Sequence, residues 1–197
     1  MEISAAMVKD LRDKTNAGMM DCKKALKETA GDMEKALDYL RQKGLAKAMK
    51  RSGREASEGA VHAYIHGGGR IGVLVEVNCE TDFAAKSEDF LEFVKNIAMH
   101  IAASNPAGIQ QEDIPEEIVQ RERAIFMAQA KETGKPENIL EKMVDGKLRK
   151  FYEESVLLQQ AYVKDPDKTI QDYLNELVAK IGEKIIIRRF ARYQLGE

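Results

Sequence analysis

Val61-His-Ala-Tyr-Ile-His66 alternates apolar and polar side chains, and after Gly67-Gly-Gly69 the chain continues as Ile71-Gly-Val-Leu-Val-Glu-Val77. Alternation with a period of two predicts a β-strand with one buried face. The glycines predict a tight turn, because glycine adopts backbone angles that other residues avoid. The second run is more continuously apolar, as expected of a strand with neighbours on both sides. The stretch therefore predicts a β-hairpin whose second strand is central in a sheet.

Helical patterns lie on both sides of this hairpin. Residues 1–44 predict three short helices, separated at Asn16-Ala17-Gly18 and at Gly31-Asp32, with the third ending at Gly44. Residues 155–168 look irregular, and Ile185 to Tyr193 predicts a last strand. Further helices are expected at residues 82–104, Pro115 to Gly134, Pro136 to a break at Gly146, and Thr169 to Gly182.

These elements predict an α+β fold in two domains. Residues 45–57 are rich in Ala, Lys and Arg, and we expect a further helical turn or two there, followed by a linker that is the best candidate for a domain boundary. We expect residues 1–52 to form a three-helix domain plus linker. Residues 53–197 are then an α+β core with a small three-stranded antiparallel sheet.

The composition of the chain argues against several classes of protein. Lys and Arg number 31 and Asp and Glu number 33, interspersed along the chain, so no direct nucleic-acid partner is expected. Cys22 and Cys79 suggest no disulfide framework, which favours a reducing compartment. Residues 1–30 lack the apolar run of a signal peptide, and no long apolar stretch predicts a membrane span. We expect a cytoplasmic protein.

No arrangement of residues predicts bond-making chemistry, a metal site or a bound cofactor. Gly67, Gly69 and Gly72 match G-x-G-x-x-G, but a strand follows them instead of the helix that a dinucleotide site needs. His62 and His66 share one side of a strand without further ligands in the sequence around them.

Two short segments stand out as candidate contact sites. Thr81 can cap a helix that has Asp82 in its first turn, where the helix dipole favours an acid. Phe83 then either packs into the core or is presented to a partner. Met19 and Met20 follow a turn, and either both are exposed as an adaptable contact patch or one of them is buried.

Two long runs carry a family resemblance. Val8 to Leu26, which contains Thr15-Asn-Ala-Gly-Met-Met20, and Gly72 to Lys86, which contains Asn78-Cys-Glu-Thr-Asp-Phe83, resemble the elongation factor Ts family. The resemblance covers essentially the whole chain. It implies an N-terminal bundle of the ubiquitin-associated type and a single α+β core module. It also implies that this short form pairs into a homodimer.

The same resemblance implies a function. Members of the family are guanine-nucleotide exchange factors for elongation factor Tu and are not enzymes. Thr81, Asp82, Phe83 and Ala84 correspond to the loop that displaces Mg²⁺ from the GDP-bound partner, although related sequences often have Val where this chain has Ala84. Binding to the GTPase domain is expected of Arg12, Met19 and Met20, with His100 as a weaker contact.

Other functions remain open from the residues alone. An adaptor would use the helical bundle to bind partner helices and would affect no GTPase. A small hydrolase would use Cys79 with His62 or His66, yet no third group orients them. RNA binding would need more than Arg188, Arg189 and Arg192, which lie on the last expected strand.

Overall fold

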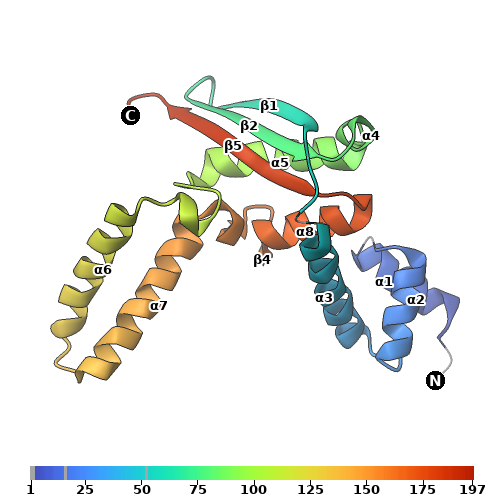
Figure 1. The fold of residues 1–197 in the computed structure, drawn as a ribbon, viewed down its shortest axis with the longest axis horizontal. Helices are drawn as coiled ribbons and strands as arrows, with labels where there is room; N and C mark the ends of the chain where they lie inside the picture. Colours follow the sequence, from blue (N-terminus) through green and yellow to red (C-terminus); the bar gives the residue numbers. More distant parts are fainter. Residues whose placement is uncertain (1–2, 16, 52) are drawn as a thin grey trace. The chain divides into compact units, whose positions relative to one another are not determined.

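The described part of the chain folds into helices and two small sheets (Figure 1). The computed structural model describes residues 3–15, 17–51 and 53–197, and of residues 45–51 it describes the backbone. The predicted α+β class is confirmed. The helices are α1 (Ala5–Thr15), α2 (Met19–Glu28), α3 (Met33–Arg51), α4 (Asp82–Ala85), α5 (Glu88–Ser104), α6 (Glu116–Lys131), α7 (Glu137–Ser155) and α8 (Ile170–Ile181). The strands are β1 (Glu58–His66), β2 (Ile71–Cys79), β3 (Ala161–Tyr162), β4 (Asp165–Thr169) and β5 (Ile185–Gln194).

The main sheet has the order β1-β2-β5, so β2 is the central strand, as predicted. The turn between β1 and β2 contains Gly67, Gly68 and Gly69, all with positive φ, which explains the glycine run. On β2, Val73, Val75, Val77 and Cys79 are buried while Leu74, between two of them, is exposed. The alternation therefore divides β2 into one core face and one open face.

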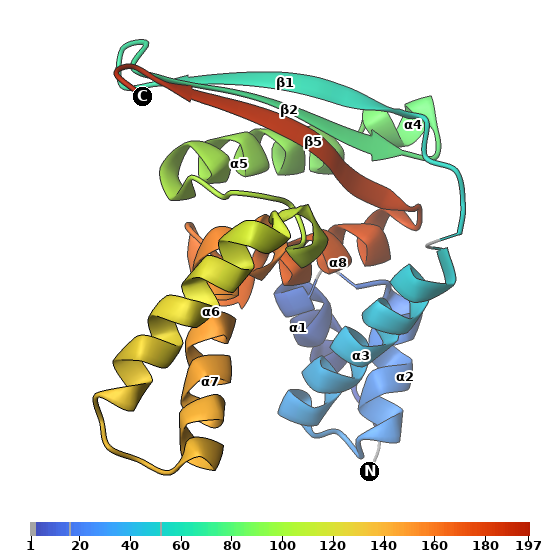
Figure 2. The ribbon, with the colours of Figure 1, turned by 60° about the vertical axis from the view of Figure 1, so that its left-hand side comes forward.

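Helix α5 supplies the apolar layer against the buried face of the sheet (Figure 2). Phe90, Phe93, Val94 and Ile97 recur at helical spacing and are all buried. Fully burying a side chain of this size contributes about 1.5–3 kcal/mol relative to leaving it exposed. Phe93 also packs on Tyr173 of α8, with ring centroids 4.9 Å apart. The loop that follows β2 is thus attached to a well-packed core.

The N-terminal helices form a bundle around a small core. Its fully buried members include Leu11 of α1, Leu26 of α2 and Ala36 of α3. Asn16, at the predicted first break, lies outside the described residues. The further helical turns predicted after Gly44 are present, but the predicted end of the third helix at Gly44 is wrong, because α3 runs through it as one helix to Arg51. Gly44 is buried beside Ala179 of α8, and the following Ala, Lys and Met residues favour helix.

Three other boundaries also differ from the predictions. The helix expected over residues 82–104 is interrupted between α4 and α5, where the Ser87 side chain donates to the Ala84 carbonyl and accepts from the Phe90 N–H. Helix α7 runs through Gly146 without a break, because α6 packs along it over a core that includes Val144 (Figure 1). The segment expected to be irregular contains β3 and β4, an antiparallel pair.

Internal contacts divide the chain into two compact units. One comprises Met1–Ala63, Leu74–Ile97 and Asp172–Phe190, and the other comprises Tyr64–Val73, Ala98–Gln171 and Ala191–Glu197. The boundary predicted at residue 52 falls on a residue outside the described ranges, and that two-domain division stays a prediction. Among the described residues, no helix has the length and apolar character needed to cross a membrane.

Candidate partner-binding site

The loop after β2 leads into a single helical turn, α4, which begins as the sequence predicts. Thr81 has an extended backbone and caps α4, because its hydroxyl oxygen accepts the Ala84 N–H at 3.2 Å. Asp82 occupies the first turn. The Cys79 thiol is buried before the loop and donates to the Thr81 carbonyl. Burial raises the pKa of Cys79 to about 11, which keeps the thiol protonated and poorly nucleophilic.

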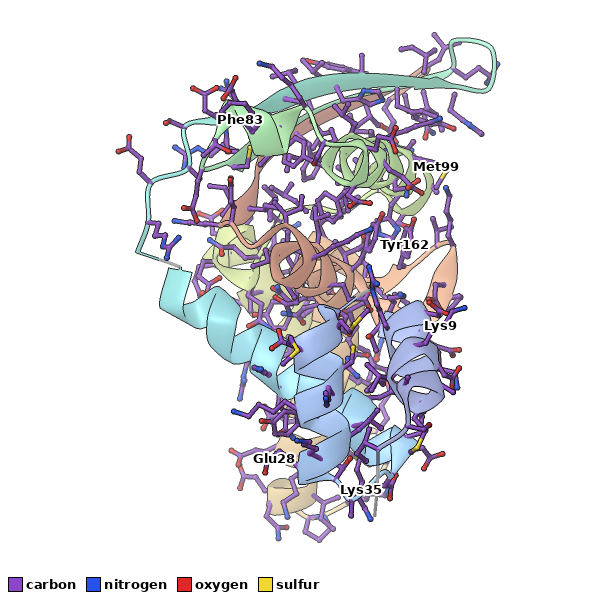
Figure 3. All side chains as sticks on the ribbon, turned by 90° about the vertical axis from the view of Figure 1, so that its right-hand side faces the viewer. Lys9, Glu28, Lys35, Phe83, Met99 and Tyr162 are labelled. Atoms are coloured by element: carbon purple, nitrogen blue, oxygen red, sulfur yellow. The ribbon has the colours of Figure 1, made fainter. Side chains whose placement is uncertain are left out.

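Phe83 is presented to solvent, with 83% of its surface exposed (Figure 3). Its neighbour Ala84 is buried and anchors the opposite side of the turn. The alternative in which Phe83 packs into the core is therefore wrong. A large exposed ring on a capped turn is unusual, because burying a phenyl group is worth about 1.5–3 kcal/mol.

Asp82 is held by a neighbouring cation. Its carboxylate accepts from the Lys86 ammonium at 2.6 Å, one helical turn further along. This hydrogen bond lowers the pKa of Asp82, so the acid is ionised at neutral pH. Lys86 is largely exposed and Asp82 is about half exposed, and ion pairs at the surface contribute little to stability. Asp82 can therefore exchange Lys86 for another positive partner at small cost.

The start of α2 carries an exposed apolar patch. Met19 and Met20 are 58% and 73% exposed, so both side chains are available for contact. Arg12 is exposed in the last turn of α1, which precedes α2 in the chain. Long, flexible methionine side chains adapt to the surface that they meet. The three residues expected to dock the bundle thus lie on the surface.

His100 occupies a different environment. It is fully buried on α5, where its Nδ1 accepts the Val163 N–H at 3.3 Å. Nε2 must then carry the proton, and it donates to the Gln160 side-chain oxygen at 2.9 Å. Burial lowers the pKa of His100 and favours this neutral form. A direct contact between His100 and a partner stays a prediction, and the structure gives His100 internal hydrogen bonds instead.

Residues far away in sequence brace the Thr81 loop, and sequence reasoning missed them. Glu183, between α8 and β5, accepts two hydrogen bonds from Thr81. Arg54 forms an ion pair with Glu80. No local pattern marks these residues, because charged residues in loops are ordinarily solvated.

The described residues contain no group of three or more His, Cys, Asp or Glu side chains placed to hold a metal ion. His66 instead makes a 3.1 Å hydrogen bond with Tyr64 on the same strand. The exposed ring of Phe83, its acidic neighbour and the methionine patch are surface features suited to contact with a partner.

Comparison with known proteins gives a consistent result. A family model described as Elongation factor TS matches residues 5–197. The chain is 80% identical over 196 residues to elongation factor Ts of Syntrophobacter fumaroxidans, covering 100% of this chain and 98% of the relative. It is 66% identical over 195 residues to elongation factor Ts of Desulfosudis oleivorans, covering 99% of this chain and 98% of the relative. Elongation factor Ts of Moorella thermoacetica is 62% identical over 195 residues, with 99% of this chain and 96% of the relative covered. Matches of this length and identity assign the chain to the elongation factor Ts family.

Proposed function

We propose that the protein is a guanine-nucleotide exchange factor for elongation factor Tu and acts in the cytoplasm during translation elongation. It binds the GDP form of the GTPase, displaces Mg²⁺ and promotes GDP release, so that GTP can bind. The process makes and breaks no covalent bond, so the protein is not an enzyme in this role. The observation that carries the proposal is the exposed Phe83 beside Asp82 on a capped turn.

Phe83 supplies binding energy that is realised only in the complex. Its ring is exposed in the free protein and gains about 1.5–3 kcal/mol when a partner buries it. Lowering a barrier by about 1.4 kcal/mol accelerates release tenfold. The free energy gained by burying this one ring is therefore large enough to accelerate GDP release about tenfold. This requires that the nucleotide-free partner buries the ring more completely than the GDP-bound partner does.

Asp82 acts on the charges around the partner's metal ion. GDP is held largely through Mg²⁺ and donors around its phosphates. An incoming carboxylate repels the phosphates and competes for cationic groups near them, and the weak pair with Lys86 leaves Asp82 free to do so. Once Mg²⁺ leaves, the charge of the phosphates is no longer neutralised and GDP departs.

GDP and the exchange factor are two ligands of elongation factor Tu, and each must weaken the binding of the other. If the exchange factor weakens the binding of GDP to elongation factor Tu, then GDP weakens the binding of the exchange factor by the same ratio. Arg12, Met19 and Met20 would provide docking contacts that do not depend on the nucleotide. Such uniform contacts hold the complex together, while Phe83 and Asp82 discriminate between its states.

The test is the release of a fluorescent GDP analogue from purified elongation factor Tu. Wild-type protein should accelerate release, and Phe83→Ala or Asp82→Ala should lower the maximal rate by about tenfold or more. Complex formation should weaken less than the rate falls. Tyr193→Ala is the matched control, because Tyr193 is another highly exposed ring. Parental rates for both loop variants would contradict the assignment of this loop.

We also propose that the free protein is a homodimer. Val61 on β1 and Leu74 on β2 are 62% and 50% exposed, although both are aliphatic residues of strands. In a symmetric dimer the same patch of each protomer lies in the interface, so each such residue is buried in both protomers. The open face of the sheet is the surface that supports this pairing.

A further inference from the structure

The segment that leads into α4 is held by the corner between α8 and β5. The Thr81 N–H donates to Glu183 Oε2 at 3.0 Å, and the Thr81 hydroxyl donates to Glu183 Oε1 at 2.7 Å. Gly182, with a φ of 86°, turns the chain at the end of α8. One carboxylate therefore binds both donors of a single residue.

This carboxylate also determines how Thr81 caps α4. A hydroxyl group has one proton to donate and lone pairs that accept. Because the proton of Thr81 is directed to Glu183, a lone pair faces the Ala84 N–H, which it accepts at 3.2 Å. Glu183 thus orients the hydroxyl group that closes the turn bearing Asp82 and Phe83.

A second set of bonds holds the preceding residue. Glu80 accepts from the Lys184 backbone N–H at 2.5 Å and from Arg54 Nη1 at 3.1 Å. The Lys184 ammonium in turn donates to the Arg54 carbonyl at 2.7 Å. Arg54, Glu80 and Lys184 form a closed ring of contacts next to the Glu183–Thr81 pair. Two consecutive loop residues are therefore fixed from outside the loop.

We propose that Glu183 is a positioning residue for nucleotide exchange, and that the Arg54–Glu80–Lys184 ring is its second anchor. The inference rests on the exchange function proposed above. A helix of four residues is far too short to be stable alone, and the Phe83 ring has no core contact to hold it. The external carboxylate keeps the turn formed before the partner arrives. A preformed turn avoids the entropy cost of ordering it when Phe83 and Asp82 engage the already docked partner, so that this cost does not slow GDP release.

Glu183 acts on the loop more than on the fold. It is only partly buried, whereas the end of β2 is already secured by buried Val77 and Cys79. Removing the carboxylate should leave the sheet intact and loosen residues 81–84. A positioning role therefore predicts a loss in the maximal rate of GDP release with little change in the concentration needed for half-maximal effect.

The kinetic experiment compares three variants in the assay with the GDP analogue. Glu183→Ala should lower the maximal rate about tenfold (about 1.4 kcal/mol) and change the half-saturating concentration less than about twofold. Glu183→Gln should recover only part of the rate, because its single amide oxygen still accepts the Thr81 N–H, whereas its NH₂ group cannot accept the proton of the Thr81 hydroxyl. Glu92→Ala, an exposed glutamate on α5, is the control and should behave as wild type. An unchanged maximal rate for Glu183→Ala, or an equal loss for Glu92→Ala, overturns the proposal.

Amide hydrogen exchange in the free protein tests the same positioning without the partner. In Glu183→Ala the amides of Thr81 and Ala84 should exchange faster, while those of β2 keep their protection. Unchanged exchange at Ala84 overturns the proposal. If the wild-type protein fails to accelerate GDP release, the proposed function is refuted, and the exchange of Ala84 then decides the positioning role alone.

Discussion

Phe83 and Ala84 are adjacent in the chain, yet the first is largely exposed and the second is buried. In a helix, consecutive side chains are rotated by about 100° around the axis, so neighbours in sequence can face different environments. Here the small residue anchors the turn and the large one faces solvent, the reverse of the usual preference. This inversion is the strongest residue-level sign that the turn exists to meet another molecule.

The buried His100 leads us to predict that the stability of the folded protein depends on pH. Its pKa is lowered by burial, so the folded protein keeps His100 neutral where the unfolded chain begins to bind a proton. The unfolded state then binds more protons, and stability falls as the pH drops below the ordinary histidine value of about 6.5. Denaturant unfolding between pH 5.5 and 7.5 should give a smaller free energy of unfolding at the acidic end.

One histidine variant isolates this effect. His100→Gln should be less stable overall but should lose part of the pH slope, because no proton is taken up at that position. An identical slope in wild type and His100→Gln would assign the pH dependence to other groups.

At the scale of elements, some glycines leave room for a side chain, whereas others are required by a close backbone contact. Gly146 lies inside α7 with open space around its Cα, and a methyl group at Gly44 of α3 would make an ordinary 3.8 Å contact with Ala179. At Gly59 of β1 a Cβ would lie 2.1 Å from the Val77 carbonyl oxygen, and φ is +146°. The first two positions tolerate a side chain, and the third excludes one.

Alanine substitution at these positions should therefore have opposite effects. Gly146→Ala and Gly44→Ala should each raise the free energy of unfolding by about 0.5–1 kcal/mol, because alanine loses less entropy in a helix. Gly59→Ala should lower it, since the backbone of β1 or β2 must move. Urea denaturation with unchanged m-values measures all three. Destabilisation by Gly146→Ala would mean that α7 does not pass straight through this residue.

At the scale of the whole molecule, the open sheet face predicts the state of association. Light scattering of the free protein should give about twice the chain mass of 22.1 kDa. Placing two lysines there, in the double variant Val61→Lys and Leu74→Lys, should halve that mass, because burying unpaired charges is costly. Ile118→Lys, at an exposed aliphatic residue of α6 and not of the sheet, should leave the mass unchanged. A wild-type monomer at micromolar concentration would contradict the dimer.

Much of the fold was predictable from local patterns. The hairpin with β2 at the centre, the cap at Thr81 and the last strand follow from side-chain alternation, glycine and capping chemistry within a few residues. The resemblance of two long runs also pointed to the family that the comparisons then assigned. Such features are predictable because the interactions that produce them act between neighbours in sequence.

Other features depended on contacts between distant segments. Whether Phe83 is buried, whether α3 is interrupted at Gly44 and what surrounds His100 were decided by packing against residues far away in the chain. Glu183 lies 102 residues from Thr81, and nothing in its local sequence reveals that bond. Periodicity reports which face of an element is apolar. It does not report which partner covers that face, and that choice arises only when the whole chain has packed.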